Sequence, residues 1–343
     1  MEELMNDTLN IPNQKYELTD KTMTFGNDVY YQIRALRDFG EVHKGDLGGW
    51  VQSPLCLSQR GKCWLDSSSF IEKNARVNGN AKIVRSSIED SGHVSGDAVL
   101  YDSYVRDQAK VTDKASIFNS NIANHACVME NTIVRKISII SDNAIIKGNA
   151  VIESSYVEGN AVVKDKAMVT DSILRDNARV YGSTHVIDST LHDRAKVYGK
   201  AQINGECELS DKAEIYGCAK VTHVFMHHNS KICGSALVKA EGKYDSALEL
   251  FDEVQIKGSS VISILHDRIT KDRPLHIRGN LVFSDVEVYN VKDLHLAIDR
   301  AMKESEKLSN TNSTQEKNKT KSSLRMKKNA IVLKDLKDLA NEL

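Results

Sequence analysis

Apolar residues recur along most of this chain at a fixed short spacing. The steps between them run six, five and six residues, so that three steps span seventeen. The first block of this apolar series is Val77, Ile83, Ile88, Val94, Leu100, Val105, Val111, Ile117, Ile122 and Val128. It resumes at Ile139 and Ile152 and continues through Val157, Val163, Val169, Leu174, Val180, Val186, Leu191, Val197, Ile203, Leu209, Ile215 and Val221. Steps of five and six exclude a helical stripe and indicate stacked coils of a solenoid.

A small residue stands two positions before most members of the apolar series, as at Ala81 and Ser86. Alternation with a period of two places both residues on one face of a short strand. Gly, Asp or Asn comes two positions earlier still, as at Gly79, and these residue types form turns at low cost. Three such strand-and-turn units close one coil. The pattern therefore predicts an all-β fold, a left-handed parallel β-helix of hexapeptide type with mostly 17-residue coils, regular between Leu65 and Val238.

One corner of each coil is predicted to be shorter than the others and lined with serine. The serines in the five-residue unit are Ser86, Ser103 and Ser120, and then Ser155, Ser172 and Ser189, seventeen residues apart within each group. Because they stack on successive coils, we expect their hydroxyl groups to bond nearby backbone.

The segments before and after the regular coils are predicted to cap them. Residues 16–36 alternate around Gly26, Asn27 and Asp28, which predicts a β-hairpin within an N-terminal segment covering 1–56. The regular β-helix covers 57–238. Irregular terminal coils with a loop insertion are predicted at 239–290, where the apolar residues Ile277, Phe283 and Val288 again step by six and five.

The C-terminal part of the chain changes pattern at Lys292. A capping helix is predicted at 291–303, since helical spacing relates Leu294, Leu296, Ile298, Ala301 and Met302. Residues 304–323 are polar and low in complexity, which predicts a flexible linker. A last amphipathic helix is predicted at 324–343, with one apolar face formed by Ile331, Val332, Leu336, Leu339 and Leu343. That face could dock on its own solenoid or on a partner.

Composition narrows the class of protein without naming a function. The 46 Lys and Arg nearly balance the 47 Asp and Glu, so no overall field attracts nucleic acid or anionic lipid. No apolar run reaches the length of a membrane span. The six cysteines stand singly, and the chain opens without a basic-then-apolar secretion signal. We therefore expect a cytoplasmic protein with no membrane partner and no specific nucleic-acid partner.

The N-terminal half carries a specific signature ahead of the Asn-Ala units that start the coils. Its residues are Asp38, Phe39, Gly48, Gly49, Trp50, Val51, Leu57, Ser58, Gly61, Cys63 and Trp64. On these residues the chain resembles the YdcK-like hexapeptide-repeat proteins of bacteria and phages, over residues 30–235. The resemblance implies a left-handed β-helix and acyltransferase activity, with acyl-CoA as co-substrate and a trimeric assembly.

The repeat departs in one respect from the usual unit of that superfamily. Asn, Ser, Thr, Tyr or Lys directly follows the aliphatic residue here, and Gly or Asp comes one position later. The contacts that relatives make with the acyl donor therefore cannot be transferred by alignment.

Histidines are the candidate general bases of an acyltransferase, because a base needs reach and a suitable pKa. The candidates are His125, His185, His192, His223, His227 and His228. The apolar step from Val221 to Ile232 is eleven residues without a clear middle member, so a corner loop is predicted there. His227 and His228 lie in that segment and are the preferred catalytic alternative. Histidine also occurs on exposed turns of solenoids without any catalytic role.

Two other kinds of site find little support in the sequence. The spacing of Cys218, His223, His227 and Cys233 matches no standard structural zinc motif, so no metal site is predicted. The segment GDLGGW lacks the lysine and the following helix of a phosphate-binding loop. Its glycines more simply turn the chain into the first coil.

Outward aromatic residues suggest a binding surface. Tyr181, Tyr198 and Tyr216 follow members of the apolar series at spacings of seventeen and eighteen, so they should form one aromatic column. Tyr101 and Phe118 should form a shorter one. Exposed aromatic columns mark ligand or protein interfaces, although packing between coils explains them equally well.

Three functions remain open from the sequence. The preferred hypothesis is a non-catalytic β-solenoid that binds or scaffolds other molecules and self-associates into a homo-oligomer. The second is an acyl-CoA-dependent acyltransferase with His227 or His228 as base. The third is a phage-type protein that sequesters a host nucleotide signal or protein. No cofactor is predicted apart from acyl-CoA as co-substrate of the second function.

Overall fold

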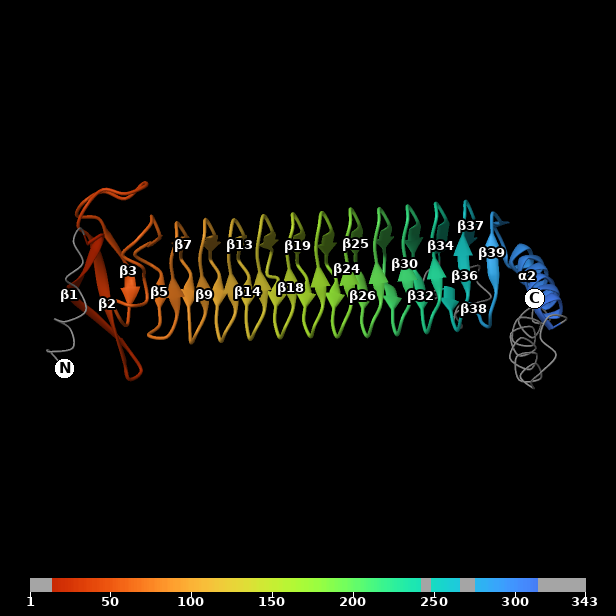
Figure 1. Cartoon of the computed structure of the whole chain (residues 1–343), viewed down its shortest axis with the longest axis horizontal. Coiled ribbons are helices and arrows are strands. Elements are labelled where there is room, and N and C mark those ends of the chain that lie inside the picture. The colour runs from red at the N-terminus through yellow and green to blue at the C-terminus, as the bar shows by residue number, and fades with distance from the viewer. Residues whose placement is uncertain (1–13, 242–247, 266–274, 314–343) are drawn as a thin grey trace. The chain divides into compact units, whose positions relative to one another are not determined.

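The computed structural model describes residues 14–241, 248–265 and 275–313. The chain divides into two compact units, 1–149 and 150–343. Within the described residues each unit is a parallel β-solenoid, whose coils cross three faces that we number in chain order (Figure 1). The predicted all-β solenoid of mostly seventeen-residue coils is confirmed.

In unit 1 the strands of each face follow one another coil by coil. Face 1 consists of β1 (Tyr16–Phe25), β2 (Asp28–Ala35), β3 (Leu47–Val51), β5 (Phe70–Ile71), β8 (Ser87–Ile88), β11 (Tyr104–Val105), β14 (Asn121–Ile122) and β17 (Ile139–Ile140). Face 2 consists of β6 (Arg76–Val77), β9 (His93–Val94), β12 (Lys110–Val111), β15 (Cys127–Val128) and β18 (Ile145–Ile146). Face 3 consists of β4 (Trp64–Leu65), β7 (Lys82–Val84), β10 (Val99–Tyr101), β13 (Ser116–Phe118) and β16 (Ile133–Arg135).

Unit 2 repeats the same three faces. Face 1 consists of β20 (Tyr156–Val157), β23 (Ile173–Leu174), β26 (Ser189–Leu191), β29 (Cys207–Leu209), β32 (Val224–Met226), β35 (Leu248–Leu250) and β38 (Leu275–Ile277). Face 2 consists of β21 (Val162–Val163), β24 (Arg179–Val180), β27 (Lys196–Val197), β30 (Glu214–Ile215), β33 (Lys231–Ile232), β36 (Gln255–Lys257) and β39 (Val282–Ser284). Face 3 consists of β19 (Val151–Glu153), β22 (Met168–Thr170), β25 (His185–Ile187), β28 (Gln202–Asn204), β31 (Lys220–Thr222), β34 (Leu237–Glu241), β37 (Val261–Leu265) and β40 (Glu287–Val288).

The apolar series and the small residues fill the interior of the coils, as the pattern predicts, except that Ile140 and not the predicted Ile139 is the inward residue of β17. Leu100 and Ile117 pair in register on face 3, and neither has any exposed surface; the same holds for the small residues Ala98 and Ala115. Burying one Val, Leu or Ile side chain contributes about 1.5–3 kcal/mol. Stability therefore accumulates coil by coil, through contacts between neighbours.

The corner loop predicted between Val221 and Ile232 is not present, and all of these residues are described. Strand β32 crosses face 1 there, with Val224 and Met226 buried. The prediction was wrong because Met226 takes the position of the usual aliphatic residue and Val224 takes the position of the usual small residue. His227 and His228 consequently project from a regular coil.

Each coil has three corners with different chemistry. The aspartate corner joins faces 1 and 2, the glycine corner joins faces 2 and 3, and the serine corner joins faces 3 and 1. At the glycine corner Gly79 has φ of 71°, and a Cβ there would lie 2.7 Å from the backbone nitrogen of Gly96. A side chain at Gly79 would therefore crowd the next coil, whereas Asp113 and Glu130 take the same corner position on later coils with positive φ.

The serine corner is held by the hydroxyl groups, as predicted. The Ser103 hydroxyl donates to the Tyr101 carbonyl at 2.8 Å and accepts the backbone N–H of Ser120 on the next coil at 3.3 Å. Ser86 does the same with Val84 and Ser103, at 2.7 and 3.0 Å. Each serine thus joins its own coil to the next.

The predicted N-terminal hairpin extends face 1. Strands β1 and β2 pair antiparallel around Gly26, and β2 pairs with β3, which runs parallel to β5 of the first coil. A Cβ on Gly49 would lie 2.3 Å from the Asp66 carbonyl oxygen, so only glycine allows β3 to approach the coil this closely. The hairpin therefore covers the first coil's face 1 edge, which would otherwise expose unpaired backbone.

Helix α2 (Val291–Ser313) follows the last described coil. Asn290 caps it by accepting the backbone N–H of Asp293 at 3.0 Å. The helix contacts β39 and β40, and its Leu294 and Ile298 side chains are buried. Two details differ from the prediction, since Leu296 is exposed and the helix continues through 304–313, the start of the predicted linker. The predicted last helix at 324–343 lies outside the described residues.

No helix in the described ranges is both long enough and apolar enough to cross a membrane.

We predict that Ser103→Ala lowers the free energy of unfolding by about 1–3 kcal/mol, because it leaves the buried N–H of Ser120 without an acceptor. Ser87→Ala is the matched control: it is an outward serine of the same coil, and its loss should cost less than about 0.5 kcal/mol. Urea unfolding of both variants measures the difference. Equal losses would show that the serine corner does not stabilise the stack.

Candidate functional site

The aspartate corner of unit 2 stacks polar side chains that bond from coil to coil. Asp176 accepts the backbone N–H of Asp193 at 3.1 Å, and Asp193 accepts that of Asp211 at 3.1 Å. Asp211 then accepts the N–H of His228 at 2.9 Å, and the His228 ring accepts the N–H of Asp252 at 3.1 Å. All five residues have positive φ, between 55° and 59°. Aspartate suits this role because it tolerates left-handed turns and offers acceptors.

Two hollows lie beside this corner and share part of their lining. The first, of about 470 Å³, is lined by Asp176, Asn177, Asp193, Arg194, Asp211, Lys212, His228 and Asn229. The second, of about 500 Å³, is lined by Arg194, Lys196, Lys212, Glu214, Asn229, Lys231, Glu253 and Gln255. Arg194, Lys212 and Asn229 belong to both, so one column of side chains separates an acidic hollow from a basic one.

Glu214 pairs two of the lysines in the basic hollow. Its carboxylate lies 2.9 Å from the Lys196 amine and 3.5 Å from that of Lys231. Burial alone would raise the pKa of Glu214, but the two lysines outweigh it and hold that pKa below its ordinary value. Among the described residues, neither Arg194 nor Lys212 forms an ion pair with an acidic side chain. The lining therefore contains four cationic and two acidic side chains, an excess of positive charge.

The predicted aromatic column is present on face 2. The Tyr198 ring is stacked on Tyr181 at 5.0 Å and on Tyr216 at 4.8 Å, nearly parallel to both. Lys164 lies 5.1 Å from the centre of the Tyr181 ring. Both faces of Tyr198 are thus covered, and the column presents ring edges rather than a platform for a planar ligand. Burial, followed by the nearby Glu214, raises the pKa of Tyr198.

His227 lies at the end of face 1 against an aromatic partner. Its ring is stacked on Phe251 with centroids 4.7 Å apart, and its Nδ1 lies 2.8 Å from the Ser210 hydroxyl. Burial lowers the pKa of His227, although the nearby carboxylates Glu249 and Glu208 oppose this. The ring is therefore neutral near neutral pH, as a general base must be.

The other predicted histidines lie on different coils. His228 occupies an aspartate position of the corner, where its Nδ1 bonds the next coil. His223 lies at the serine corner, with Nδ1 3.1 Å from the Ala240 carbonyl oxygen. His185 is on face 3, and His125 follows the aspartate corner of unit 1. The structure does not gather them into one site.

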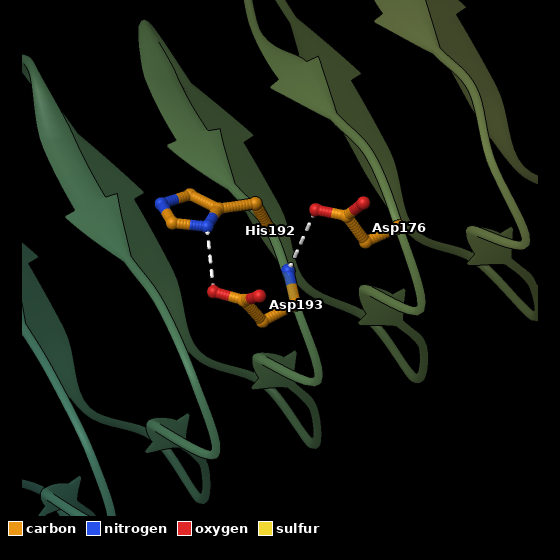
Figure 2. A group of neighbouring side chains, drawn as sticks. All are labelled: Asp176, His192 and Asp193. Atoms are coloured by element: carbon orange, nitrogen blue, oxygen red, sulfur yellow. Dashed lines mark hydrogen bonds and ion pairs between the residues drawn. The ribbon is translucent and has the colours of Figure 1, made fainter.

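One group of three residues was not predicted from the sequence. Asp176, His192 and Asp193 place a ligand atom each within 4.8 Å of one another (Figure 2), and they are the metal-ligand cluster found among the described residues. His192 also contacts Glu208 on the next coil, with Nε2 3.0 Å from Oε1. The regular spacing of these aspartates indicated turn positions. The contact between His192 and Glu208 joins residues sixteen apart, so it becomes visible only once the coils are in register.

Comparison with known proteins gives one short match. The "Uncharacterized acetyltransferase YdcK" of Escherichia coli (strain K12) is 31% identical over 84 residues, which make up 22% of this chain and 26% of that protein. The predicted resemblance to YdcK-like proteins is confirmed. The match spans about a quarter of the length of YdcK, and no family model matches the chain.

A solved structure from Desulfovibrio desulfuricans G20, described as a candidate acetyltransferase, is similar over 70% of this chain and 69% of its own. It is 10% identical, and the TM-score is 0.21.

The lowered pKa of His227 predicts a contribution to acid sensitivity. Since the unfolded chain binds this proton more readily than the folded one, stability should fall as the pH drops below about 6.5. We expect His227→Gln to lose less unfolding free energy between pH 7.5 and 5.5 than the natural chain. Identical pH dependence in the two proteins would contradict the burial of this ring.

Proposed function

We propose that the chain is a ligand-binding β-solenoid whose site is the aspartate corner of unit 2 and the adjoining part of face 2. The ligand carries phosphate or a similar oxyanion. The observation that carries the proposal is the basic hollow, where four cationic side chains from three coils outnumber two carboxylates. Arg and Lys side chains at this density are the usual partners of phosphate oxygens.

The geometry of the stack favours an extended ligand. Arg194 and Lys212 stand at the same position of consecutive coils, and Lys196 and Lys231 stand on face 2 two coils apart. Successive coils are about 4.8 Å apart. Two phosphate groups joined in one molecule would span neighbouring cationic positions better than a single phosphate would.

Binding without catalysis agrees with the positions of the histidines. His228 and His223 use a ring nitrogen in bonds between backbone and side chain, and His192 contacts two carboxylates. A histidine ring that holds two coils together cannot turn toward a reacting group without breaking that contact. We also propose that the chain self-associates, as predicted from its sequence.

We predict that inorganic pyrophosphate binds the chain saturably and that Arg194→Ala/Lys212→Ala weakens binding at least tenfold, about 1.4 kcal/mol. The matched control is Lys110→Ala, which removes a cation from the face 2 column of unit 1. Isothermal titration at two salt concentrations measures both affinities, and the affinity should fall at high salt. Equal affinities of the natural chain and the double variant would refute the site.

A second candidate function is acyl transfer, and two specific observations favour it. One is the similarity to YdcK, a protein named as an acetyltransferase. The other is His227, whose pKa is lowered by burial and whose ring contacts the Ser210 hydroxyl; its neighbour His228 lines the acidic hollow. Acyl-CoA is itself a phosphate-bearing molecule, so both functions use the basic hollow. The difference lies in turnover: an acyltransferase would move the acetyl group of acetyl-CoA to a hydroxyl or amine of an acceptor and release CoA as the thiol, with His227 taking the acceptor's proton. His227→Gln would abolish this transfer while leaving acetyl-CoA binding intact.

A further inference from the structure

His192 has carboxylates at both of its ring nitrogens. Nδ1 lies 2.8 Å from an Asp193 oxygen, and Nε2 lies 3.0 Å from a Glu208 oxygen. The side chain is largely buried, with 17% of its surface exposed. A neutral imidazole carries only one N–H. Its N–H can donate a hydrogen bond to one of these carboxylates, but the lone pair of its other nitrogen then faces the second carboxylate.

A positive charge between Nδ1 and Asp193 removes this conflict. Figure 2 shows that Asp176, from the preceding coil, lies on the same side of the corner. Its carboxylate, like that of Asp193, uses one oxygen to accept a backbone N–H of the next coil. A carboxylate has about four lone-pair positions, so each aspartate can bind a cation and keep its structural bond.

We propose that Asp176, His192 and Asp193 form a binding site for a divalent transition metal, with Zn²⁺ as the best match. Imidazole nitrogen and carboxylate oxygen are both common zinc ligands. Glu208 is the outer carboxylate that zinc-binding histidines typically have at the other ring nitrogen. It holds the Nε2 proton and leaves Nδ1 free for the metal.

The present spacing requires a small adjustment. The three ligand atoms lie within 4.8 Å of one another, whereas tetrahedral zinc ligands are about 3.3 Å apart, from bond lengths near 2.0 Å. The 2.8 Å between Nδ1 and the Asp193 oxygen must lengthen and the widest separation must shorten, which rotation of the exposed Asp176 and Asp193 side chains allows at little cost. Three ligands leave a coordination position open to the acidic hollow, which Asp176 and Asp193 also line.

Unit 1 contains the matched control for this site. Asp90 and Asp107 occupy the same corner on consecutive coils, and Asp107 accepts the backbone N–H of Asn124 at 3.0 Å. The residue before Asp107 is Arg106 instead of a histidine. The structural role of the aspartates is therefore present in both places, and the metal-binding set only in unit 2 among the described residues.

The test is titration of the metal-free full chain with Zn²⁺, and separately with Ca²⁺, in the absence of any phosphate compound. We expect one Zn²⁺ per chain, bound more tightly than Ca²⁺. Asp193→Asn and His192→Ala should each weaken Zn²⁺ binding at least tenfold, and Glu208→Gln by about ten- to a hundredfold. Asp107→Asn should leave the affinity unchanged.

Several results would overturn the metal site. They are Zn²⁺ affinity equal in Asp193→Asn and Asp107→Asn, Ca²⁺ bound as tightly as Zn²⁺, or no stoichiometric binding by the natural chain. Because phosphate is omitted, failure of the proposed ligand function leaves this test unaffected.

Discussion

Hydrogen bonds from corner side chains to the backbone of the next coil are the interactions on which this structure depends. Strands of two or three residues pair too briefly to fix their own register. Ser103 at one corner and Asp193 at another each accept an N–H one coil further on. These bonds repeat only if each coil has nearly the same length, so the seventeen-residue repeat and the corner chemistry constrain one another.

The same constraint decides what the surface can do. Residues at equivalent positions of consecutive coils become direct neighbours, so a change of residue type along a column creates a local chemical feature. Tyr181, Tyr198 and Tyr216 form a stacked column in this way, and Arg194 and Lys212 form a cationic one. On such a scaffold we expect a functional site where the residues of a column depart from the repeat, since the fold alone does not specify chemistry.

Much of the fold could be predicted from the sequence, because each coil repeats one simple pattern. The period revealed the three faces, the serine corner and the tyrosine column. Met226 was missed because its residue type lies outside the aliphatic series. The helical segment 304–313 was missed because polar residues leave no apolar period. The His192 and Glu208 contact was missed because it joins two coils, and sequence spacing alone does not say which outward side chains face each other.

We propose that the cationic columns of unit 2 bind an oxyanion. A crystal of the full chain soaked in tungstate tests it directly, because tungstate resembles phosphate and scatters anomalously. We expect an anomalous peak in the basic hollow, in contact with Lys212 and with Lys196 or Lys231. Peaks confined to other surfaces, with this hollow free of tungstate, would contradict it.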